Sequence, residues 1–165
     1  MSEIIKRQDN RREFIDTLCE LAQKDDRIVL ITCDVGFNYI ETFQNKFPNR
    51  YFNFGVTEQS SVLIAAAMAL DGWKPYFYSM INFVLFRPAE MVRNGIVMHN
   101  APVTLIGVKG SESYKFLGFS HNLKHDKEDI NFCDNIGLDW IVATDHIPEM
   151  IRERYKQQKP VYIRL

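Results

Sequence analysis

The stretch NFGVTEQSSVLIAAAMAL, residues Asn53–Leu70, joins a short aromatic strand to an apolar helix and carries one carboxylate at the junction. Small and apolar residues after Glu58 are typical of a buried helix, and Gly72 is typical of a helix end. Capping is the simplest explanation of the charge, because Thr57 or Glu58 can satisfy free N–H groups at the positive end of the helix dipole. The alternative is that Glu58 faces a ligand.

Strand and helix patterns alternate along the whole chain on both sides of this stretch. Apolar runs predict strands over 27–35, 50–56, 74–80, 102–108, 138–144 and 160–165. Helical spacing predicts helices over 11–23, 40–47, 58–72, 88–99 and 147–157, whereas 109–129 is predicted as a long loop. The alternation predicts an α/β fold: a doubly wound, mostly parallel sheet with helices on both faces. We expect one domain over residues 1–165, with a polar lead-in over 1–10.

Bulk composition excludes several classes of function. A chain of 165 residues with a net charge of -1 fits one domain and gives no electrostatic reason to bind nucleic acid or a membrane surface. The longest apolar run, 62–70, is too short to cross a bilayer, and the polar start lacks a signal-peptide core. Three scattered cysteines without a CxxC pair favour a reducing compartment. We therefore predict a cytoplasmic protein.

Candidate site residues follow the predicted strands. Asp34, Glu58, the segment 80–86 and the residues from Lys109 onward all fall at the carboxyl ends of predicted strands. Because ligands of open parallel sheets bind beyond the carboxyl ends of the strands, these segments should meet at one rim. This convergence favours a ligand-facing Glu58, although a cap and a binding role are compatible.

Familiar ligand motifs are absent from the sequence. It contains no GxGxxG, no GxxxxGK[ST] and no GxSxG. His121 and His125 stand four apart, but in a predicted loop rather than on a helix, so we predict no metal site.

One order of motifs resembles the pyrimidine-binding domain of transketolase, from about Arg11 to Leu165. The residues that carry it are CDVG, FPNRYFNFGVTEQ, AAAMALDGWKPYFYSMINFVLFRPAEMVRN, APVTLIGV, GFSH and PVYIRL. The resemblance implies thiamine diphosphate as cofactor. It also implies a catalytic role for Glu58, which would hydrogen-bond a pyrimidine ring nitrogen and donate a proton there, while the cofactor carries the ketol-transfer chemistry.

The resemblance places further side chains around the cofactor. Phe83 corresponds to the ring that stacks on the aminopyrimidine, and Phe86 to a second aromatic wall. Met80 stands where the family often has Phe, and Asp34 matches an acidic residue near the cofactor. For Phe83, Phe86 and Met80 the alternative is ordinary core at a strand end. For Asp34 it is capping of the next turn.

Substrate residues follow from the same resemblance. His121, in GFSH, matches a catalytic-site histidine that contacts sugar hydroxyls. Arg11 and Arg164 match two arginines that hold a sugar phosphate, and guanidinium forks suit phosphate. The alternatives are a solvated Arg11 and a strand-end Arg164. Lys109 replaces a substrate-contacting histidine and Leu117 an acidic residue, so we expect substrates other than the standard pentose phosphates, in specialised sugar biosynthesis.

A partner chain is also implied. The family's diphosphate-binding domain carries GDG, then Asn about thirty residues later, and binds Mg²⁺; no GDG occurs here. We expect a stand-alone pyrimidine-binding subunit of a split transketolase, as a homodimer within a heterotetramer with that partner. The alternatives are a subunit of a split 1-deoxyxylulose-5-phosphate synthase or 2-oxo acid dehydrogenase-type enzyme, and a non-catalytic scaffold paralogue.

Overall fold

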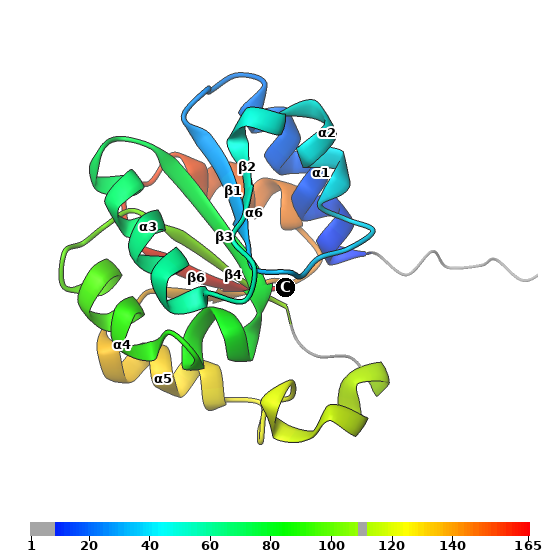
Figure 1. The fold of residues 1–165 in the computed structure, drawn as a ribbon, viewed down its shortest axis with the longest axis vertical. Helices are drawn as coiled ribbons and strands as arrows, with labels where there is room; N and C mark the ends of the chain where they lie inside the picture. Colours follow the sequence, from blue (N-terminus) through cyan, green and yellow to red (C-terminus); the bar gives the residue numbers. More distant parts are fainter. Residues whose placement is uncertain (1–8, 109–111) are drawn as a thin grey trace, which may run out of the picture.

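A computed structural model of the protein describes residues 9–108 and 112–165 (Figure 1). Within these residues six strands form one sheet in the order β2-β1-β3-β4-β6-β5. Every neighbouring pair is parallel. The strands are β1 (Ile28–Thr32), β2 (Tyr51–Asn53), β3 (Lys74–Met80), β4 (Thr104–Val108), β5 (Trp140–Val142) and β6 (Val161–Arg164). The predicted α/β fold with a doubly wound sheet is confirmed, and the described sheet is entirely parallel.

Helices cover both faces of the sheet (Figure 1). One face carries α1 (Asn10–Ala22), α2 (Glu41–Lys46) and α6 (Ile147–Tyr155), and the other carries α3 (Glu58–Leu70), α4 (Ala89–Met91) and α5 (Glu128–Ile136). Alternate residues of β3 serve the two cores: Tyr76 and Tyr78 pack under α1, and Phe77 packs under α3. All five residues of β1 are buried, which explains its continuous apolar run.

Helical structure begins earlier than predicted after β3. A π-helical segment, η2 (Asn82–Phe86), precedes α4, and a second, η3 (Val92–Val97), follows it. Pro88 lacks the N–H of a regular α-helical ladder, and the neighbouring Arg87 N–H donates to the Asn82 carbonyl at 2.9 Å, a π-type spacing. The predicted helix over 88–99 is therefore the second half of a longer helical segment.

The region predicted as a loop also differs. A 3₁₀ segment, η4 (Glu112–Ser120), is interrupted at Gly118, and α5 begins at Glu128 within the predicted loop. The sequence does not indicate the amphipathic pattern of α5, because Asp129 is fully buried and a charged residue is normally expected to face solvent. Gly137 ends α5 with a left-handed φ of 74°.

A buried carboxylate organises the amino ends of the central strands. Asp25 is 8% exposed and accepts hydrogen bonds from Arg27 Nε at 2.9 Å and Tyr155 Oη at 2.9 Å. Lys74 Nζ lies 3.0 Å from its Oδ2. The Arg27 hydrogen bonds hold the pKa of Asp25 well below its usual range. This network joins β1, β3 and α6 at the end of the sheet opposite to the predicted site.

In the parts of the chain that the structure describes, no helix combines the length and the apolar character needed to traverse a lipid bilayer.

Candidate functional site

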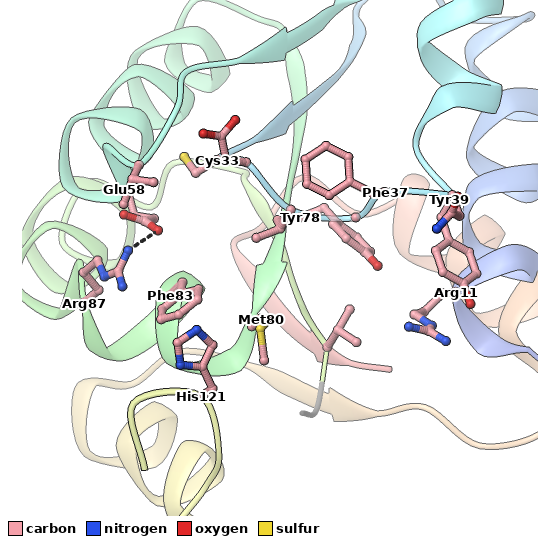
Figure 2. A pocket seen from close by; sticks show the side chains of 16 residues that line it. Arg11, Cys33, Phe37, Tyr39, Glu58, Tyr78, Met80, Phe83, Arg87 and His121 are labelled. Carbon is pink, nitrogen blue, oxygen red and sulfur yellow. Dashed lines mark hydrogen bonds and ion pairs between the residues drawn. The ribbon is translucent and has the colours of Figure 1, made fainter. Parts of the chain in front are cut away.

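A cavity of about 510 Å³ lies beyond the carboxyl ends of β1 and β3 (Figure 2). β1 pairs with β2 on one side and with β3 on the other, so the connections that leave these ends diverge toward opposite faces. In open α/β sheets such a switch point is the usual ligand site. The segment 33–39, the start of α3, η2 and His121 all contribute to the lining, as the sequence predicts for a shared rim.

Glu58 contributes a buried carboxylate to this lining. It is the first residue of α3 and is 2% exposed. Thr57 makes no side-chain capping bond; its hydroxyl donates to the Phe54 carbonyl at 2.9 Å instead. The Glu58 carboxylate accepts from Arg87 Nη1 at 2.6 Å. The side chain therefore points toward η2 and the cavity, while its position in the first turn still suits the helix dipole.

Phe83 forms an aromatic wall beside Glu58. Its ring is 8% exposed, and the Arg87 guanidinium carbon lies 4.0 Å from the ring centroid. The His121 ring meets Phe83 edge-on, with centroids 4.9 Å apart. Figure 2 shows these four side chains turned toward one another from α3, η2 and the segment after η4.

Arg87 was missed by the sequence reasoning. Phe83 and Arg87 are four residues apart, a spacing that brings side chains together on one side of a helical turn. The sequence contains this spacing, but it indicates a contact only if 82–87 is helical, whereas the sequence predicts an aromatic strand end there.

The turn after β1 is fixed by Asn53, another residue that the sequence reasoning missed. The Asp34 N–H donates to Asn53 Oδ1 at 3.0 Å, and Asn53 Nδ2 donates back to Asp34 Oδ1 at 2.9 Å. Asp34 has a positive φ of 52° and also lines the cavity, so its turn role and its predicted site position coexist. At Gly36 an added Cβ would lie 2.9 Å from Tyr78 Cε1, so this loop packs tightly on β3.

Cys33 lines the cavity next to the start of α3. Its thiol donates to Ser61 Oγ at 3.3 Å, and Ser61 in turn bonds the Thr57 hydroxyl at 3.1 Å. Burial raises the pKa of Cys33, so the side chain is a neutral thiol.

Arg11 and Met80 also line the cavity. Figure 2 places Arg11 at the opposite end from Glu58. Its guanidinium carbon lies 4.2 Å from the Tyr39 ring centroid, and its Nε lies 3.5 Å from Asp9 Oδ1. Arg11 is thus a partly exposed cation on the rim rather than a fully solvated one.

Two other predicted residues, Phe86 and Arg164, lie outside this lining. Phe86 packs on Phe132 with ring centroids 5.7 Å apart, in the core below the cavity. Arg164 Nη1 lies 3.1 Å from Oδ1 of the buried Asp129, and neither Phe86 nor Arg164 belongs to the lining of this cavity. Lys109 falls outside the described residues. The roles predicted for these three side chains stay predictions.

Comparison with known families identifies the class of protein. The family described as transketolase, pyrimidine binding domain, matches residues 6–165, and the chain belongs to this family. The family match and the confirmed fold agree with the resemblance noted from the sequence, and the roles of the site residues stay predictions.

Individual relatives span several transketolase-type proteins. A subunit of the apulose-4-phosphate transketolase of Phocaeicola vulgatus is 28% identical over 156 residues, covering 94% of this chain and 50% of that protein. The putative transketolase C-terminal section of Methanocaldococcus jannaschii is 28% identical over 158 residues, covering 94% and 49%. A 1-deoxy-D-xylulose-5-phosphate synthase of Clostridium perfringens is 32% identical over 142 residues, covering 83% and 22%. The chain therefore spans about half the length of the two transketolase relatives and less of the synthase.

A solved structure described as split gene transketolase, inactive beta4 tetramer, matches with a TM-score of 0.81 and 26% identity. The match covers 94% of this chain and 50% of that one.

Proposed function

We propose that this chain is the pyrimidine-binding component of a thiamine-diphosphate-dependent transketolase-type enzyme. The reaction is transfer of a two-carbon ketol unit between sugars or sugar phosphates. A second polypeptide holds the diphosphate and Mg²⁺. The chain acts as one such domain over residues 1–165, in a reducing, cytoplasmic setting that suits its free cysteines.

The observation that carries this proposal is the burial of Glu58 beside the Phe83 ring. A carboxylate that is only 2% exposed needs a hydrogen-bond donor as its partner. The face of a phenyl ring is best covered by a flat apolar group or by a cation. An aminopyrimidine supplies a ring nitrogen, a planar face and an amino group. The Arg87 guanidinium, itself planar and rich in N–H groups, already makes both contacts, so a flat donor group fits the space.

The roles of the side chains follow from their positions. Thiamine diphosphate, when bound, supplies the carbanion chemistry of ketol transfer. Glu58 would hold and return a proton at a pyrimidine ring nitrogen, and Phe83 would orient the ring by stacking. His121, at the cavity mouth, would contact sugar hydroxyls, and Arg11 on the opposite rim would bind a substrate phosphate.

A partner subunit is supported by the relatives. One of them is itself a transketolase subunit, and the similar solved structure is an inactive β4 tetramer of a split gene transketolase. By analogy, this chain alone would be inactive. It would work as a homodimer within a heterotetramer that includes the GDG-bearing polypeptide.

A second candidate, 1-deoxyxylulose-5-phosphate synthesis, is favoured by one observation: the synthase relative has the highest identity of the three named. The two functions differ in the donor, which is a ketose or ketose phosphate in the first and pyruvate in the second. His121 on the Phe83 ring and Arg11 on the rim support the sugar donor, as histidine and guanidinium groups suit hydroxyls and phosphate.

The test is reconstitution with a polypeptide that carries the GDG and Asn segment, together with thiamine diphosphate and Mg²⁺. We expect no turnover from either chain alone and ketol transfer from a panel of ketoses and ketose phosphates when both are present. Turnover of pyruvate in place of ketose would support the second candidate. Ketol transfer by this chain alone, or binding of the partner without any turnover, would count against the proposal.

A further inference from the structure

Arg87 bridges the two groups that the proposed function assigns to the cofactor ring. Its Nη1 donates to Glu58 Oε1 at 2.6 Å, and its guanidinium carbon lies 4.0 Å from the centroid of Phe83 (Figure 2). The guanidinium is planar and presents N–H donors at its edge, so it can bond a carboxylate while its face lies on an aromatic ring.

The same two contacts are those expected of an aminopyrimidine. Two flat groups cannot stack on the same face of one ring together, and a guanidinium that covers this face while bonded to Glu58 Oε1 occupies the position of a stacked pyrimidine. His121 contacts Phe83 as well, with ring planes at 84°, and Phe83 is only 8% exposed. Arg87 therefore lies over the Phe83 ring at the place where Phe83 and Glu58 border the cavity.

We propose that Arg87 is an internal competitor for the pyrimidine position, and that the ring binds by displacing the guanidinium from Glu58 and Phe83. The inference rests on the proposed pyrimidine-binding function and adds a specificity-determining residue to it. The ligand class is a planar 4-aminopyrimidine able to share a hydrogen bond with a carboxylate. A ligand without a ring edge that pairs with Glu58 would not displace Arg87.

Displacement requires only the side chain to move. The Arg87 N–H is held by the Asn82 carbonyl at 2.9 Å, and the Arg87 carbonyl accepts from Gln59 Nε2 at 3.4 Å. The Arg87 side chain is 39% exposed, so rotation carries it toward solvent without unfolding η2 or α3. Rotamer changes of such partly exposed side chains take picoseconds to nanoseconds, so the exchange would limit affinity rather than rate.

The size of the effect follows from population arithmetic. The apparent dissociation constant rises as the fraction of open molecules falls. A charge-assisted hydrogen bond and a cation–π contact together favour the closed arrangement, so we expect removal of the guanidinium to tighten ring binding about tenfold, or about 1.4 kcal/mol.

The experiment titrates the full 165-residue chain with thiamine, which carries the aminopyrimidine but no diphosphate and so needs neither Mg²⁺ nor a partner. Calorimetry compares the natural chain with R87A, R87K and R93A. R87A should bind about tenfold more tightly. R87K keeps the charge but loses the planar fork, so it should gain less. R93A is the matched control, because Arg93 lies in η3 and donates to Asn94 Oδ1 instead.

A second readout does not depend on a substitution. In a ¹⁵N-labelled natural chain, thiamine should move the Arg87 Nε–H resonance toward that of a solvated arginine, while the Arg93 resonance stays in place. Melting curves show whether each variant is folded. If R87A does not fold, the affinity of R87K and the Arg87 resonance of the natural chain still test the proposal.

The outcomes separate the two proposals. Equal or weaker binding by R87A and R87K, with an unmoved Arg87 resonance, would overturn the exchange and leave the pyrimidine site standing. Failure of every chain, including folded R87A, to bind thiamine at millimolar concentration would overturn the exchange, whereas the pyrimidine-binding function is tested separately by reconstitution with the GDG-bearing polypeptide.

Discussion

Replacing Glu58 with Gln separates the catalytic role of this carboxylate from any structural role. The amide is nearly the same size and keeps one oxygen that can accept from Arg87, whose Nη1 lies 2.6 Å from Oε1. A hydrogen bond to a charged group contributes about 1.5–3 kcal/mol and a neutral one about 1 kcal/mol. Because Arg87 is 39% exposed, solvent screens part of the charge, and we expect E58Q to lose about 1 kcal/mol of unfolding free energy.

That loss predicts a small change in melting temperature. For a chain of this length, 1 kcal/mol corresponds to about 2–4 °C. Activity should respond far more strongly, because the amide cannot deliver a proton to a pyrimidine nitrogen. Loss of a proton-transfer group typically costs about 10²–10⁴-fold in rate. The assay measures ketol transfer by the reconstituted complex and the melting temperature on the same sample.

E128Q is the matched control. Glu128 is the first residue of α5, as Glu58 is of α3, and it accepts from the Lys124 N–H at 2.6 Å, away from the cavity. Both substitutions therefore remove a carboxylate from the first turn of a helix, and only E58Q should lower activity by this factor. Near-normal turnover by E58Q together with a large drop in melting temperature would refute the reasoning and make Glu58 a structural residue.

Three other outcomes test the fold around the site. D25N should lower the unfolding free energy by about 2–3 kcal/mol at pH 7. Arg27 holds the pKa of Asp25 well below its usual range in the folded chain, so the Asp25 anion stabilises the fold above about pH 4. In urea melts, the stability difference between the natural chain and D25N should therefore shrink as the pH falls toward 2. A difference that does not change with pH would contradict this. G36A should destabilise more than G55A by about 1–3 kcal/mol, since both glycines have positive φ but only at Gly36 would a Cβ meet other atoms; equal melting temperatures would count against the tight packing of this loop. The three cysteines should resist a thiol reagent at pH 7 until the chain unfolds, since all are buried and burial raises the pKa of Cys133 to about 12; rapid labelling of the native chain would disagree.

Much of the fold could be predicted because its signals are local. The strand predicted over 74–80 has the bounds of β3, and the helix predicted from Glu58 begins there. Regular alternation then implies a parallel sheet, and the parallel sheet implies a common rim for the segments that follow its strands. Glu58 and the segment 80–86 could thus be expected at one rim before any distance was known, and the family resemblance added the roles of Phe83 and His121.

Other features have no local signal. α5 was missed because its buried Asp129 accepts from the Tyr162 hydroxyl at 2.7 Å, a partner 33 residues away that makes a charged residue part of the core. The Arg164 guanidinium lies 3.1 Å from the same carboxylate, a contact that the sequence does not predict, while its predicted phosphate role stays a prediction. Which partner a cation finds depends on the packing of distant elements.

By itself, the sequence determined the alternation of strands and helices, the rim where the strands end and the presence of a carboxylate on it, because periodicity and strand ends depend on residues that are close together in the chain. Only the tertiary structure decided what that carboxylate contacts. Glu58 and Arg87 are 29 residues apart, on α3 and at the end of η2, and their 2.6 Å contact exists because both elements pack against one face of the sheet. Such a contact is set by three-dimensional packing, and no spacing along the chain encodes it.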